Sequence, residues 1–216
     1  MEKKNKTRLF VGIGLIFAFI VWTVLVGTAD VKIAGPNDSA VGFATVNTFF
    51  HRLFGVNMLL YTVTDWLGLV PIAVAFAFAM LGLVEWIKRK SILKVDLNII
   101  LLGVFYLIVI GVYILFESVV INYRPVLIEG YLESSYPSST TLLTATVMPT
   151  AKIQLNARIK KKAFRKSISL IITLFTALVV LGRLISGVHW LSDIIGGMLF
   201  SIGLVETYRS VFNSIK

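Results

Sequence analysis

The sequence predicts an all-α, polytopic membrane protein, a bundle of six transmembrane helices that forms a single domain over residues 1–216. Three observations support this fold class. The 216 residues are 57% hydrophobic and only 15% charged, whereas about a quarter of the residues in soluble domains are charged. The apolar residues form long runs that are nearly free of charge, which is typical of membrane spans. Lys and Arg gather at the ends of these runs, as they do in cytoplasmic loops.

Each expected span is a continuous apolar run, and the six runs cover residues 9–26, 67–87, 97–116, 141–156, 167–184 and 191–211. The first run follows a basic N-terminus. The small residues Gly27-Thr28-Ala29 after it leave a cleaved signal peptide as an alternative to a retained span. Residues 40–55 mix phenylalanines with polar residues, which predicts an interfacial amphipathic helix. Asp65 and Trp66 then mark the outer end of span two, as a helix-start carboxylate and an aromatic anchor.

The later spans are separated by polar or basic segments. Lys88-Arg89-Lys90 ends span two, and a polar segment, residues 117–141, follows span three. Span four is short and contains Pro149, which neighbouring helices can accommodate. The basic segment 158–166 separates it from span five. Glycines within the spans are expected at helix-packing positions, namely Gly12, Gly14, Gly103, Gly111, Gly196 and Gly197.

The distribution of positive charge predicts the topology. Of the 21 Lys and Arg residues, 17 fall on the side shared by the N-terminus, the loops after spans two and four, and the C-terminal tail. Both termini are therefore expected in the cytoplasm of a multi-pass inner-membrane protein, and the number of spans is even. Because this placement explains the net charge of +10, nucleic-acid binding is not expected. The absence of cysteine and the presence of only two histidines argue against disulfides and against a metal site; the compact, basic chain suggests a bacterial protein.

Three ionisable residues lie where spans five and six meet, on the opposite side from the basic loops. Ionisable groups near membrane depth are expensive and usually functional. His189 and Asp193 are four residues apart and share one helical face, so the carboxylate can fix the imidazole tautomer and leave the other nitrogen free. Arg183 can bind two phosphate oxygens at once. The alternative is an interfacial His–Asp cap, with Arg183 reaching lipid headgroups.

Two further segments on the same side carry phosphate-binding groups. Arg124-Pro125 supplies a second guanidinium. Pro137-Ser138-Ser139-Thr140 presents hydroxyls and free backbone N–H groups directly before span four, where a helix N-terminus can bind an anion. An ordinary Ser/Thr cap is the alternative interpretation. The convergence of these groups on one side favours a phosphate site.

These residues resemble the signatures of the type 2 phosphatidic acid phosphatase family. Residues 183–193 (RLISGVHWLSD) have the arginine, histidine and aspartate of the last signature at the family's spacing. Tyr123-Arg124-Pro125 resembles the end of the first signature, and residues 137–140 align with the second, Pro-Ser-Gly-His. The resemblance implies an integral-membrane phosphatase without metal or cofactor, which acts on lipid phosphates or diphosphates at the extracytoplasmic face.

The resemblance also implies roles for individual residues. His189 is expected to be the nucleophile that forms a phosphohistidine, and Asp193 to orient it. The resemblance implies that Arg124, Arg183 and Ser138 bind the phosphate, and the anion site expected at the start of span four adds Ser139 and Thr140.

Three departures from the family's pattern bear on the chemistry of the site. Glu117 replaces a lysine, Gly182 a serine, and Thr140 the second-signature histidine, which is the general acid. Threonine cannot supply a proton at neutral pH, and losing a general acid costs about a hundredfold to ten-thousandfold in rate. Glu117 is the alternative acid, with Glu133 and His51 as further candidates.

Several functions remain open from the sequence. Besides hydrolysis, the scaffold could transfer phosphate to an acceptor, or bind or transport lipid phosphates without catalysis. The candidate substrates are phosphatidic acid, phosphatidylglycerophosphate and polyprenyl diphosphate. The missing histidine favours a diphosphate, because a phosphate leaving group needs less protonation. The expected partners are this substrate and the bilayer; the oligomeric state is not predicted.

Overall fold

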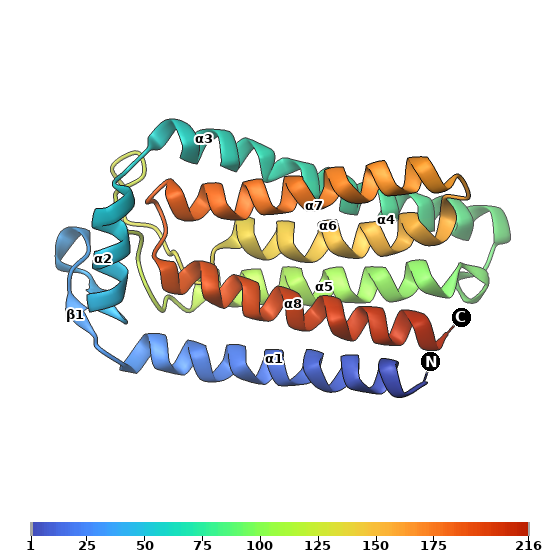
Figure 1. Cartoon of the computed structure of the whole chain (residues 1–216), viewed down its shortest axis with the longest axis horizontal. Coiled ribbons are helices and arrows are strands. Elements are labelled where there is room, and N and C mark those ends of the chain that lie inside the picture. The colour runs from blue at the N-terminus through green and yellow to red at the C-terminus, as the bar shows by residue number, and fades with distance from the viewer. Residues whose placement is uncertain (1, 216) are drawn as a thin grey trace.

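A computed structural model describes residues 2–215 as a bundle of long helices (Figure 1). Within these residues, five segments are long and apolar enough to cross a membrane: α1 (Glu2–Thr28), α3 with α4 (Met58–Arg89), α5 (Leu97–Ser118), α7 (Lys162–Ile185) and α8 (Leu191–Ser214). Their outward faces remain apolar, as in Phe10, Leu107 and Leu174. The predicted all-α, polytopic membrane fold is thus confirmed.

Helix α6 (Ser139–Arg158) contains the predicted span 141–156 but differs from the other long helices. It has 20 residues, enough to cross a hydrocarbon core of about 30 Å. It is rich in threonine, and 11 of its residues are buried. In Figure 1 it runs through the middle of the bundle, beside α7 and α5. Since α6 is not among the helices apolar enough to span alone, the count of six spans stays a prediction.

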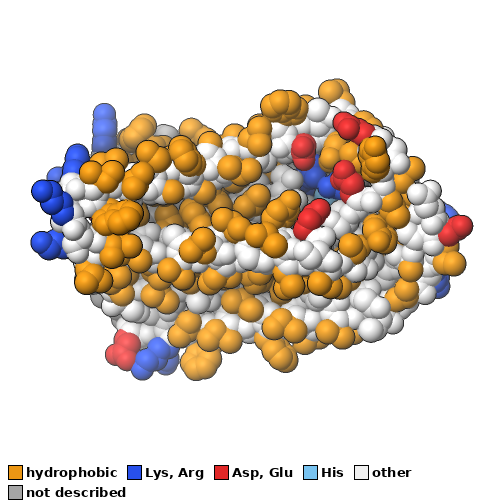
Figure 2. Space-filling view, turned by 180° about the vertical axis from the view of Figure 1, so that it is seen from behind, with side chains coloured by type: hydrophobic (Ala, Val, Ile, Leu, Met, Phe, Trp, Pro, Cys, Tyr) orange, Lys and Arg blue, Asp and Glu red, His pale blue; other side chains and the backbone are white. Residues whose placement is uncertain are grey.

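Both termini lie at one end of the bundle, together with the α4–α5 and α6–α7 connections (Figure 1). Figure 2 shows Lys and Arg side chains gathered at that end, and acidic side chains around a hollow near the other. This arrangement agrees with the sequence-based expectation that Lys and Arg gather on the side shared by both termini. The bundle therefore has a basic end and an acidic end.

A short helix, α2 (Ala44–Phe54), crosses the acidic end of the bundle (Figure 1). It follows a two-stranded hairpin, β1 (Lys32–Ile33) paired antiparallel with β2 (Ala40–Val41), which includes a turn at Pro36–Asp38. Asn47 is buried and anchors α2 to the start of α8: its amide nitrogen donates to the Ser192 hydroxyl (2.9 Å), and its carbonyl accepts from the Ser192 backbone N–H (3.1 Å). The helix expected over residues 40–55 is present, but it begins at Ala44.

Span two begins earlier than expected. A separate helix, α3 (Met58–Leu67), precedes α4 (Leu69–Arg89) and is divided from it at Gly68. Pro71 accounts for the break, because it lacks an N–H and its ring clashes with the carbonyl four residues earlier. The prediction of Asp65 as a helix-start carboxylate is wrong, since this residue lies in the last turn of α3. Trp66 is 70% exposed, as an aromatic anchor would be.

An aromatic cluster holds the loop before α6 against α1, α5 and α8. Phe19 packs on Phe116 and Phe200, with ring centroids 5.7 and 5.0 Å apart. Tyr136 stacks on Phe19, and its hydroxyl lies 2.7 Å from the Thr23 hydroxyl. A side chain at Gly196 would collide with Tyr136, because its Cβ would lie 2.6 Å from the ring. This packing fixes the start of α6 against the start of α8.

Three of the six glycines expected at packing positions lie in close contacts. Gly12 permits the approach of α1 to α8, and Gly196 and Gly197 permit that of α8 to the start of α6. The prediction is wrong for Gly14, Gly103 and Gly111, where a Cβ would meet nothing within 4 Å.

The variant Gly12→Leu is expected to destabilise the fold relative to Gly14→Leu. A Cβ at Gly12 would lie 2.8 Å from the Gly203 carbonyl oxygen, a backbone atom that cannot move aside cheaply. Overpacking of this kind costs about 1–3 kcal/mol. Both variants gain the same helix propensity, so their difference in unfolding free energy, measured by SDS titration in mixed micelles, isolates the clash. Equal stabilities would contradict the packing of α1 on α8.

Candidate active site

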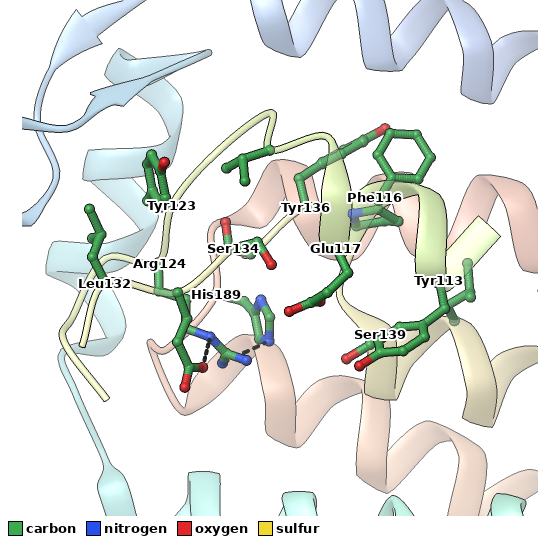
Figure 3. Close-up of a pocket in the computed structure, with 15 residues that line it drawn as sticks. Tyr113, Phe116, Glu117, Tyr123, Arg124, Leu132, Ser134, Tyr136, Ser139 and His189 are labelled. Atoms are coloured by element: carbon green, nitrogen blue, oxygen red, sulfur yellow. Dashed lines mark hydrogen bonds and ion pairs between the residues drawn. The ribbon is translucent and has the colours of Figure 1, made fainter. Parts of the chain in front are cut away.

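His189 lies in the short turn between α7 and α8, and its ring is the centre of the candidate site. The residue is 3% exposed. Its Nε2 lies 3.1 Å from Nη2 of Arg183 and 3.3 Å from Nη1 of Arg124. Figure 3 shows the ring and the Arg124 guanidinium together at the pocket. The structure therefore brings together two arginines that are 59 positions apart in the sequence.

Asp193 lies on the other side of the imidazole. Its Oδ2 is 3.5 Å from Nδ1 of His189 and accepts a hydrogen bond from the Trp190 backbone N–H (2.9 Å). The Ser192 hydroxyl donates to Oδ1 (3.4 Å). A carboxylate in this position favours a proton on Nδ1 and leaves the lone pair of Nε2 facing the two guanidinium groups. Such an imidazole can act as a nucleophile.

The environment keeps His189 neutral. Burial, followed by the positive charges of Arg124 and Arg183, lowers the pKa of His189 well below its ordinary value of 6.5. The direction follows from physics, since desolvation and nearby cations both disfavour the imidazolium form. A neutral ring retains the Nε2 lone pair at physiological pH.

Arg124 is held by the loop in which it lies. Its backbone N–H donates to the Glu133 carbonyl (3.0 Å), and its Nε lies 3.1 Å from the Glu133 carboxylate. The Trp190 indole N–H donates to the Tyr123 carbonyl (2.7 Å) and ties this loop to the turn that carries His189. The acidic partner of Arg124 is therefore Glu133.

The start of α6 presents only part of the expected anion site. Ser138 is fully buried; its hydroxyl accepts from the Thr141 backbone N–H (3.5 Å), and its own N–H donates to the Asp193 carbonyl (3.2 Å). Ser138 thus caps the helix. Thr140 packs against Gly68, where an added Cβ would lie 3.1 Å from its methyl group. Of the three residues, Ser139 alone is among those that line the pocket.

The pocket beside His189 has a volume of about 460 Å³. Its polar lining includes Arg124, Ser139, Glu117 and Glu133. Glu117 projects into this space in Figure 3, and within residues 2–215 it forms no ion pair. Figure 2 shows acidic side chains around the hollow and a basic one inside it. The pocket therefore combines a cationic floor with an acidic rim.

The other candidate acids lie less favourably than Glu117. The Glu133 carboxylate is engaged by Arg124. The His51 ring packs against the Trp190 ring, with centroids 5.4 Å apart, and His51 is not among the lining residues. In the described part of the chain, no group of three or more His, Cys, Asp or Glu residues has a geometry suited to a metal ion.

Two contributors to the site were missed by sequence reasoning. Tyr61 and Asp65 on α3 both contact the Arg183 guanidinium. Their spacing of four residues places them on one helical face. That signal was missed, because span two was expected to begin at residue 67 and residues 58–66 were not assigned to a helix.

Comparisons with known proteins agree with this geometry. The family model of the PAP2 superfamily matches residues 114–216, which include Arg124, the start of α6 and His189. The crystal structure of the first transmembrane PAP2 type phosphatidylglycerolphosphate phosphatase from Bacillus subtilis is similar in fold, with a TM-score of 0.65. The two share 17% sequence identity over 96% of this chain and 98% of that one. No match was found among curated proteins. Residues 114–216 thus resemble the PAP2 superfamily, and the chain as a whole shares the fold of a transmembrane PAP2 type phosphatase.

Proposed function

We propose that the protein is a membrane lipid phosphatase that hydrolyses a lipid phosphate or diphosphate through a phosphohistidine on His189, without a metal ion. The observation that carries the proposal is the convergence of Arg124 and Arg183 on the Nε2 atom of a buried His189. The match of residues 114–216 to the PAP2 superfamily model and the similarity in fold to a membrane phosphatase support the same class of reaction.

In the first step, the His189 Nε2 lone pair attacks phosphorus and forms a P–N bond while the bond to the leaving oxygen breaks. The imidazole becomes positively charged, and the Asp193 carboxylate beside Nδ1 stabilises it. Arg124 and Arg183 stabilise the negative charge on the phosphoryl oxygens. In the second step, water attacks phosphorus, releases inorganic phosphate and restores neutral His189.

The leaving group identifies the favoured substrate class. Thr140 packs against Gly68 and cannot protonate a departing alkoxide. Glu117 lines the same pocket as His189 and is the proposed acid for alkyl esters. A diphosphate depends less on such an acid, because its leaving group is a phosphate. We therefore favour a lipid diphosphate such as polyprenyl diphosphate over phosphatidic acid.

The proposed orientation follows from the charge distribution. The pocket lies at the acidic end of the bundle, opposite both termini and the basic connections (Figures 1 and 2). Positively charged loops are retained in the cytoplasm. We accordingly place the pocket at the extracytoplasmic face of the bacterial inner membrane.

The variant His189→Ala is expected to lose phosphate release by about a thousandfold or more, because the nucleophile is removed. The measurement is phosphate release by detergent-purified protein, in EDTA, from polyprenyl diphosphate and phosphatidic acid in parallel. Circular dichroism and the unfolding midpoint establish that the variant is folded. Unchanged release would refute the mechanism. Release that requires an added lipid or glycan acceptor would identify a transferase, and binding without release a lipid-phosphate binder.

The variant Glu117→Gln is expected to lower kcat for phosphatidic acid by about a hundredfold, the contribution typical of a general acid. The loss should be much smaller for polyprenyl diphosphate, since its leaving group needs less protonation. Glu129→Gln is the control, because Glu129 lies in the segment that follows α5, the helix that carries Glu117, but is not a lining residue. Equal losses on both substrates would assign Glu117 a role other than proton donation.

Activity is expected to persist as the pH falls through the range in which a histidine is ordinarily protonated, because the pKa of His189 is lowered. Protonation removes the Nε2 lone pair, so kcat/KM should decline only at a pH well below the ordinary histidine pKa of 6.5. In Arg124→Gln, one of the charges that lowers this pKa is gone, and the acid limb should move to higher pH. Ionisation of the substrate is common to both enzymes and cancels in their comparison. Coincident acid limbs would contradict the assignment.

A further inference from the structure

Two residues of helix α3, Tyr61 and Asp65, contact the arginines of the site. The guanidinium carbon of Arg183 lies 4.7 Å from the centroid of the Tyr61 ring, and that of Arg124 lies 5.7 Å from it. Asp65, one turn further along α3, places Oδ1 3.3 Å from Nη1 of Arg183. One face of α3 therefore contacts both cationic groups of the pocket.

The docking of α3 on α7 depends on close backbone contacts. A Cβ at Gly182 would lie 2.6 Å from the Thr64 methyl group, so glycine permits the approach of the two helices. The Asn57 backbone N–H donates to the Ser186 carbonyl (2.9 Å), and the Asn57 side chain caps α3 through the Leu60 N–H (2.9 Å). These contacts fix Tyr61 and Asp65 relative to Arg183.

Tyr61 and Asp65 reduce the electrostatic repulsion between Arg124 and Arg183. Two guanidinium groups that share one imidazole nitrogen repel each other, and burial strengthens this repulsion. The face of an aromatic ring attracts cations, and the Asp65 carboxylate offsets one of the two charges. The contact with Asp65 uses Nη1 of Arg183 and leaves Nη2 directed at His189.

We propose that Tyr61 and Asp65 are positioning residues, which hold the guanidinium groups of Arg183 and Arg124 where they stabilise the phosphoryl group in transfer. The inference rests on the proposed function of His189. Tyr61 and Asp65 themselves are not placed in contact with the reacting atoms. Their contribution therefore acts through the arginines.

The test compares five variants of the full-length protein in the phosphate-release assay. Asp65→Asn and Tyr61→Leu are expected to lower kcat about tenfold to a hundredfold, the effect of a small misplacement of catalytic groups, with little change in KM. Asp65→Glu and Tyr61→Phe retain the carboxylate and the ring, and should recover most of the activity. Leu59→Ala is the matched control on α3, because Leu59 is 76% exposed and faces away from the site.

Unchanged kcat in folded Asp65→Asn and Tyr61→Leu would overturn the proposal. So would a lower KM in Asp65→Asn, which would mean that the carboxylate competes with phosphate for Arg183. A loss of activity that parallels a fall in unfolding midpoint, without recovery in Tyr61→Phe and Asp65→Glu, would assign α3 a purely structural role.

Orthovanadate binding tests the positioning role of Tyr61 and Asp65 independently of the proposed function. If release by the wild type does not depend on His189, the dissociation constant of orthovanadate is measured by calorimetry for the wild type, Asp65→Asn and Tyr61→Leu. Weakening by about tenfold in both variants would support the positioning of the arginines. Equal affinities would overturn it, and a wild type that neither releases phosphate nor binds orthovanadate would overturn both proposals.

Discussion

The structure depends on the approach of two guanidinium groups to one uncharged imidazole nitrogen. Arg183 and Arg124 lie 3.1 and 3.3 Å from Nε2 of His189, and all three residues are at least 91% buried. Two cations this close repel strongly away from water. Each is matched by its own carboxylate, Asp65 for Arg183 and Glu133 for Arg124. The first pair connects α3 to α7, and the second lies within the loop before α6, so the site and the fold at this end of the bundle stabilise each other.

Hydrogen bonds between helices also join several buried polar groups in the interior of the bundle. The Thr150 hydroxyl lies 3.2 Å from the Tyr106 hydroxyl. The Gln154 amide donates to the Tyr208 hydroxyl (2.5 Å) and to the Asn98 carbonyl (2.9 Å). Unsatisfied polar groups are costly in an apolar medium. Neighbouring helices therefore provide partners for Thr150 and Gln154 of α6, and the central position of this helix brings its N-terminus to the candidate site.

Much of this arrangement was predictable because its signals are local. Long apolar runs identify membrane helices, and the spacing of His189 and Asp193 places both on one face of a helix start. The assignment of Asp65 failed because its role depends on Arg183, a residue on another helix. The same limit applies to Thr140. Its position in the family signature predicted that it lies in the pocket, but it packs against Gly68 and is not a lining residue. The break at Gly68, which requires the combined effect of Pro71 and the docking of α3, was also missed.

The sequence by itself determined the all-α membrane class, the basic end of the bundle and the histidine–aspartate pair, since hydropathy, charge and helical spacing act over a few turns. Only the tertiary structure decided that Glu133 rather than Glu117 pairs with Arg124, and that Ser138 caps a helix. It alone revealed the contacts of Tyr61 and Asp65 with Arg183. The physical reason is that ion pairs and ring contacts depend on distances between segments far apart in the chain, which helix packing sets and local patterns do not encode.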